Sequence, residues 1–123
     1  MAMKNQHYAS FDAYLTEVAD ALAVEYRAAV DAGLILQIEA PDLALERHLS
    51  YAERPVSEFV AFVHQVIAQI NRVLAGIPRE RVRLHVCWGN YESPHDHDVP
   101  LNDIADAILQ ADVGAFMMPF ANP

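Results

Sequence analysis

The residues best suited to chemistry are His85 and Cys87, in the stretch RVRLHVCWGN at residues 81–90. Apolar and polar residues alternate along this stretch, and a period of two predicts a β-strand over residues 81–88. Side chains two positions apart point to the same face, so we expect the imidazole and the single thiol of the chain to lie about 6–7 Å apart. Gly89 ends the strand and places the pair at its C-terminal edge, where α/β folds carry their sites. Zinc favours these two ligand types, although two ligands do not complete a zinc site. The alternative to a metal-binding role is a structural one, in which the thiol is buried and the imidazole is hydrogen-bonded.

The composition restricts the classes of function. The chain has 123 residues, of which 54% are hydrophobic, and this predicts one modest domain with a real core. A net charge of −9 argues against nucleic acid or an anionic membrane surface as a partner. One cysteine fits a reducing compartment, and the N-terminal residues lack the pattern of a secretory signal. No apolar run reaches the roughly 18–20 residues that cross a bilayer, so we expect a soluble cytoplasmic protein.

The remaining elements that must position this pair follow from hydrophobic periodicity and from helix-ending residues. Ser10 suits an N-cap and Gly33 a left-handed helix end, while Pro55 suits the first turn of a second helix. The predicted elements are a helix at 11–32, a strand buried on both faces at 34–39, a short helical turn within 42–54, a helix from 55 to about 74, the strand at 81–88, a helix at 101–110 and a buried strand at 113–118.

This order predicts an α/β fold with three parallel strands, because crossovers through a helix are right-handed. A whole (β/α)₈ barrel needs about 250 residues, so residues 1–123 are expected to form a single partial domain of about three βα units from a TIM barrel. Helices on one side of three strands leave one sheet face and both edges bare. Such exposed edges favour self-association.

Three segments resemble a known family. GLILQIEAPDLAL, residues 33–45, resembles the G-x-x-x-I-Q-I-D-x-P-x-L segment of the cobalamin-independent methionine synthase family. LHVCWGN followed by PHDHDVPL, residues 84–101, resembles the H-x-C-W-G-N…D-I-P-L stretch of shorter, single-barrel relatives. The closing ANP, residues 121–123, looks like the start of a further motif.

The resemblance implies a TIM barrel that carries a catalytic zinc, with His85 and Cys87 as two of its ligands. In the family, zinc holds a small-molecule thiol such as homocysteine as a thiolate, which takes a methyl group from a folate in methionine biosynthesis. Glu39 falls where the family has a substrate-binding aspartate, and we expect it to bind substrate. Gln37 lies on the same predicted strand face as Glu39, and Trp88 follows the metal pair. Both are further substrate-binding candidates, with packing as their alternative role.

Two departures from the family pattern bear on activity: Glu39, with a longer side chain, stands where the family has an aspartate, and the third metal ligand is missing. The segment FMMPFANP, residues 116–123, lacks the glutamate that serves the family as a third ligand, and the last cysteine ligand would lie beyond Pro123. The leading hypothesis is therefore a zinc-dependent thiol S-methyltransferase-like chain that is incomplete by itself, with no residue assigned a catalytic role.

The alternatives are a metal-free barrel relative, decarboxylase-like or ligand-binding, and a non-catalytic piece that oligomerises.

Elsewhere in the chain, His95 and His97 are expected to lie in a solvated loop without fixed geometry. Met117 and Met118 are expected to fill the core.

Overall fold

The computed structural model of the chain describes residues 5–90, 92 and 94–120. Helices and strands alternate as the periodicity predicts, and the short helical turn expected within 42–54 forms a short helix; one 3₁₀ turn is additional. In chain order the elements are α1 (Phe11–Asp31), β1 (Leu36–Glu39), α2 (Asp42–Leu45), α3 (Val56–Leu74), η1 (Arg79–Arg81), β2 (Val82–His85), α4 (Leu101–Ile108) and β3 (Ala115–Met117).

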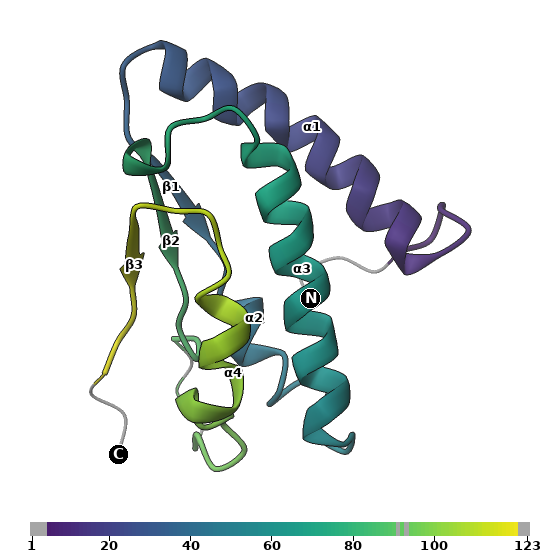
Figure 1. Cartoon of the computed structure of the whole chain (residues 1–123). Helices are drawn as coiled ribbons and strands as arrows, with labels where there is room; N and C mark the ends of the chain where they lie inside the picture. Colours follow the sequence, from purple (N-terminus) through teal and green to yellow (C-terminus); the bar gives the residue numbers. More distant parts are fainter. Residues whose placement is uncertain (1–4, 91, 93, 121–123) are drawn as a thin grey trace.

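The three strands form one parallel sheet in the order β1-β2-β3, as predicted. Leu36 pairs with Val82 and Glu39 with His85, and β3 continues the register by pairing Met117 with His85. The helices α1, α3 and α4 all lie on one side of this sheet, so the molecule has two layers (Figure 1). The mixed α/β class and the parallel strands are thus confirmed.

Only one face of the sheet is buried, which corrects the prediction of a first strand covered on both faces. Leu36 and Ile38 are buried, whereas Leu34 and Ile35 precede β1 and are 60% and 54% exposed. The last strand also differs from expectation. Met117 is 41% exposed rather than buried in the core, and only its neighbour Met118 packs partly against the core. We call the uncovered side the open face; its described strand residues are Gln37, Glu39, Arg83, His85, Ala115 and Met117.

The core lies between the sheet and α3. This helix starts directly after Pro55, and its apolar stripe at spacings of three and four buries Phe59, Val63 and Ile67 completely or nearly so. Opposite them lies Leu84 on the central strand, with no exposed surface. Such side chains each contribute about 1.5–3 kcal/mol when removed from water, so this layer supplies much of the driving force for folding.

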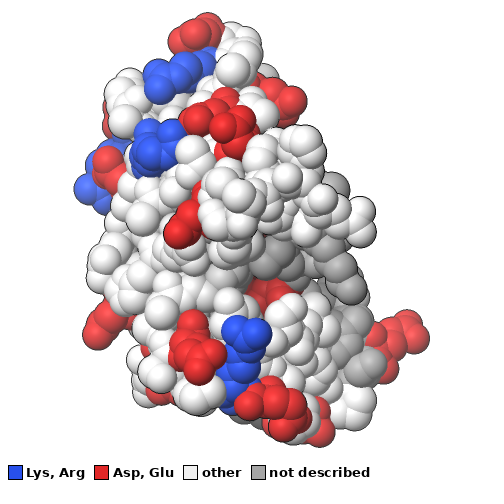
Figure 2. Space-filling model, turned by 90° about the vertical axis from the view of Figure 1, so that its right-hand side faces the viewer, with Lys and Arg blue, Asp and Glu red and all other residues white. Residues whose placement is uncertain are grey.

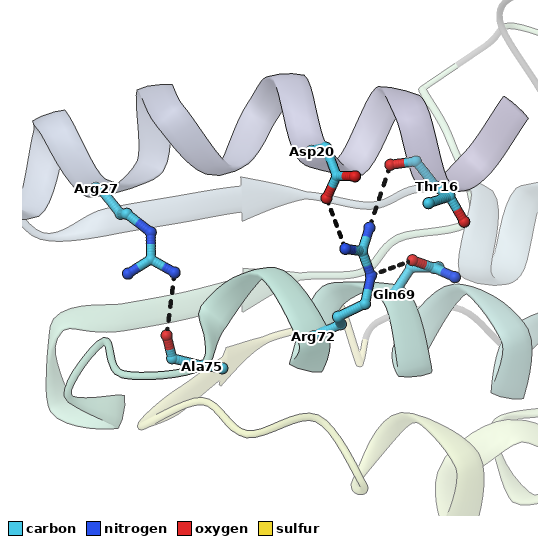
Figure 3. Close-up of polar contacts among 6 residues, drawn as sticks. All are labelled: Thr16, Asp20, Arg27, Gln69, Arg72 and Ala75. Atoms are coloured by element: carbon cyan, nitrogen blue, oxygen red, sulfur yellow. Dashed lines mark hydrogen bonds and ion pairs between the residues drawn. The ribbon is translucent and has the colours of Figure 1, made fainter. Parts of the chain in front are cut away.

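Polar contacts tie α1 to α3 (Figure 3). Arg72 on α3 donates to Asp20 at 2.6 Å, to the Thr16 carbonyl at 3.2 Å and to Gln69 at 2.8 Å. Nearer the other end of α1, Arg27 donates to the Ala75 carbonyl at 3.2 Å. These contacts add to the packing of α1, in which Ala19 is buried and Phe11, Tyr26 and Val30 are partly buried.

The predicted helix ends of α1 are confirmed. The Ser10 side chain accepts from the Ala13 amide at 3.1 Å, and Gly33 has a φ of 83°, a conformation that favours glycine. Figure 2 shows the face formed by the helices. Its charged side chains gather toward the two ends, and basic residues are mixed with acidic ones rather than forming a continuous patch. No helix in the described residues combines the length and the apolar character that a membrane span requires.

Candidate functional site

Glu39 and His85 meet at the C-terminal ends of β1 and β2. They are register partners in the parallel ladder, and Nδ1 of His85 is hydrogen-bonded to Oε2 of Glu39. The other carboxylate oxygen, Oε1, accepts a hydrogen bond from Nε2 of Gln37 at 2.6 Å. The Glu39 side chain is 56% exposed and that of His85 is 29% exposed, so the group lies on the open face. The expected common face of Gln37 and Glu39 is observed, whereas Glu39 is solvated rather than buried.

The hydrogen bonds determine the charge of this group. The hydrogen bond from His85, and then the one from Gln37, lower the pKa of the Glu39 carboxyl below its usual range. Glu39 is therefore an ionised acceptor at neutral pH, and it holds the imidazole through Nδ1. Nε2 is then the ring nitrogen of His85 that can meet a metal, a proton or a substrate.

Cys87 lies two residues beyond His85, past the last residue of β2. Burial alternates without a break through this segment, with Val86 and Trp88 buried and Cys87 half-buried, so Cys87 lies on the same side as His85. Its thiol is free. Imidazole and thiolate are ligand types that bind zinc. The described part of the chain, however, contains no group of three or more potential metal-binding side chains. The described residues thus fit zinc in ligand type and fall short in number.

Trp88 belongs to the other side of the sheet. It is 7% exposed, packs in the hydrophobic core, and donates its indole N–H to the Val99 carbonyl at 2.8 Å. The structure therefore does not bring Trp88 together with Glu39 and Gln37, although all three were candidates for one substrate site. In place of Trp88, Met117 is the register neighbour of His85 on the open face.

Residues 95–98, before α4, make more specific contacts than their polar sequence predicts. Nδ1 of His95 contacts Oδ2 of Asp98 at 2.9 Å, and the Asp98 side chain is only 14% exposed. The helix α4 itself begins without a side-chain cap. The ring of His97 lies 5.7 Å from that of His48, between centroids. The spacing of His95 and Asp98 is the one sequence signal that could have indicated their pairing.

The region expected to supply a third metal ligand lies along β3 and the residues after it. Its described residues, up to Phe120, include no carboxylate or thiol, and the ANP segment falls outside the described residues. No protein-family model matches the chain, and neither the curated proteins nor the solved structures provide a match. The family suggested by the sequence therefore remains a proposal.

Proposed function

We propose that this chain is a partial TIM barrel that contributes one half of a thiol-binding zinc centre of the methionine synthase type. The observation that carries the proposal is the pairing of Glu39 with His85 at the C-terminal edge of a parallel sheet, with Cys87 two residues further on. The resemblance of residues 33–45 and 84–101 to that family supports it independently. The substrates proposed on this basis are a small-molecule thiol and a methyl donor, in methionine biosynthesis.

Each residue of this half-site has a distinct role in the proposal. Glu39 orients the imidazole through Nδ1, as carboxylates do for metal-binding histidines, and Gln37 in turn orients Glu39. His85 and Cys87 then offer one nitrogen and one sulfur donor from the same side of the sheet. A zinc ion held there would supply Lewis acidity, which lowers the pKa of a substrate thiol.

The remaining ligands must come from outside the described residues. Typical catalytic zinc sites use about three protein ligands, and this chain offers two at the proposed position. The open face and the two sheet edges, β1 and β3, are the surfaces on which complementary barrel units would pack. Self-association through these edges is one way to complete the site.

Metal binding by the purified chain tests the proposal directly. Cobalt(II), titrated as a spectroscopic substitute for zinc, should bind weakly with a thiolate-to-metal absorption band. Cys87→Ala should remove that band, and Glu39→Gln should lower the affinity about 10–100-fold by releasing the imidazole. His64→Gln, on the exposed side of α3, is the matched control and should change nothing. A wild-type chain whose cobalt binding is the same as that of Cys87→Ala would refute the half-site.

A metal-free relative is the second candidate, favoured by the lack of a third donor among the described residues. In that case the Glu39–His85 pair would serve as a hydrogen-bonding or proton-accepting group toward a ligand on the open face. This candidate predicts no thiolate band with cobalt(II), while substitution of Glu39 or His85 still changes ligand binding. The cobalt titration therefore separates the two functions.

A further inference from the structure

A cavity lies at the end of the sheet opposite to the Glu39–His85 pair. It has a volume of about 550 Å³, within the roughly 300–1,000 Å³ typical of small-molecule sites. Its walls come from η1 and from the starts of the three strands, which lie together at one end of the sheet (Figure 1). The lining combines charged, apolar and very small residues, among them Ile35, Arg79, Glu80, Arg83, Gly114 and Ala115.

Arg83 is the polar group that this cavity presents to a ligand. It lies on the open face of the central strand, between its register partners Gln37 and Ala115, and it is exposed. Within the described part of the chain, its side chain makes no hydrogen bond and no ion pair. The planar guanidinium therefore keeps its N–H groups for a ligand, and its fork matches a carboxylate through two parallel hydrogen bonds.

Backbone contacts around Arg83 fix the shape of the cavity. Nη2 of Arg79 donates to the Val113 carbonyl at 2.9 Å, which ties η1 to the segment leading into β3. The Gly114 amide donates to the Val82 carbonyl at 3.0 Å and holds the start of β3 against β2. Because Gly114 and Ala115 carry little or no side chain, the space beside Arg83 stays open. The site is thus preformed, which reduces the entropy lost on binding.

We infer that this cavity binds a small organic monocarboxylate with an apolar body. Arg83 pairs with the carboxylate, and the side chain of Ile35, which is 54% exposed, offers a surface for the apolar body. Arg79 contributes positive charge, since one of its nitrogens is already bonded to Val113.

The charges of the lining favour a single negative charge on the ligand. Two arginines and Glu80 give the cavity a formal charge of one positive unit, in a chain whose net charge is −9. A phosphate monoester carries nearly two negative charges at neutral pH, so the field of the protein disfavours it relative to a carboxylate. This inference does not depend on the proposed zinc half-site, which lies at the other end of the strands.

The amide cross-peaks of Gly114 and Ala115 provide the readout in ¹H–¹⁵N NMR spectra. We would titrate the intact chain at neutral pH and constant ionic strength with benzoate, with its neutral counterpart benzamide, and with phenyl phosphate. Benzoate should shift both peaks saturably and bind about tenfold more tightly than benzamide, which forms only neutral hydrogen bonds with Arg83. Phenyl phosphate should bind less tightly than benzoate.

Two substitutions test the assigned roles. Arg83→Gln should fold, because the side chain is exposed and unpaired among the described residues, and should weaken benzoate binding about tenfold. Arg54→Gln, at an exposed position before α3, removes the same charge away from the cavity and should leave the affinity unchanged. Ile35→Ala should weaken the binding of benzoate but not that of acetate, which has no apolar body to pack against Ile35.

The absence of a saturable shift with benzoate, or equal losses of affinity in Arg83→Gln and Arg54→Gln, would overturn the site. Equal affinities for benzoate and benzamide would overturn the recognition of a carboxylate. Tighter binding of phenyl phosphate than of benzoate would overturn the preference for a single negative charge.

Discussion

Gly114 offers a sharp test of how β3 is held in the sheet. A Cβ added at this position would lie 2.6 Å from the Arg79 carbonyl oxygen and 2.9 Å from the Cα of Glu80. Both atoms are backbone atoms of η1, so no side-chain rotation can relieve the overlap. The Gly114 amide also donates to the Val82 carbonyl at 3.0 Å, which fixes the start of β3 against β2.

The substitution Gly114→Ala should therefore push β3 away from β2. Ordinary carbon contacts lie near 3.5–4.0 Å, and overpacking of this kind costs about 1–3 kcal/mol. Alanine also restricts the unfolded chain, which by itself stabilises the folded state by about 0.4–1 kcal/mol. We expect a net loss of about 1–2 kcal/mol in the free energy of unfolding, measured by urea denaturation, and a fall in Tm of roughly 4–10 °C.

Hydrogen exchange distinguishes this local effect from general destabilisation. The Val86 amide donates to the Met117 carbonyl at 3.0 Å, so its protection should fall in Gly114→Ala. Gly33→Ala is the matched control. Gly33 has a φ of 83° and no atom within 4 Å of an added Cβ, so alanine there strains the end of α1 without touching β3. A Gly114→Ala chain with unchanged stability and full protection at Val86 would show that our account of β3 is wrong.

Four further predictions concern the core, the helix pair and the titrating groups. Leu84→Ala should lower the free energy of unfolding by about 2–5 kcal/mol in urea, because Leu84 is fully buried on the central strand. Arg72→Met should cost about 0.5–1 kcal/mol at low salt and less at high salt, because its contacts with α1 are partly exposed. Glu39 and Asp42 have pKa values shifted in opposite directions, so their ionisation should have opposite effects on the stability of the folded chain. The hydrogen bond from His85 lowers the pKa of Glu39 in the folded chain. Ionised Glu39 therefore stabilises the folded chain above about pH 5, and this stabilisation is lost as the pH falls through the pKa of Glu39 in the folded chain. The difference in stability between the wild-type chain and Glu39→Gln should accordingly disappear in acid. Burial raises the pKa of Asp42, so its ionised form opposes folding, and Asp42→Asn should stabilise the chain at pH 7 but not below about pH 3.

Local sequence predicted those parts of the fold that depend on short-range geometry. The N-cap at Ser10 and the left-handed end at Gly33 follow from residue types alone, and both are observed. The strand around His85 was predicted from a period of two, and the same alternation correctly separated its buried and less buried sides. The short helical turn after β1 also followed from local pattern.

Other predictions failed because they required knowledge of distant packing. The apolar run that includes Leu34 and Ile35 reads as a fully covered strand, yet the helices cover only one face of the sheet. The loop around Asp98 reads as solvated and unconstrained, yet contacts with His95 and the neighbouring hydrogen bond to Trp88 hold it in place.

The candidate site likewise combines features that the local sequence determines with features that only tertiary packing decides. By itself, the sequence determined that His85 and Cys87 share a strand-like segment and one face, because side-chain direction along extended backbone is a local property. Only the tertiary structure decided that Glu39, 46 residues away, is the partner of His85, since strand register is set by packing between distant segments. The same packing placed Trp88 on the opposite side of the sheet, in the hydrophobic core.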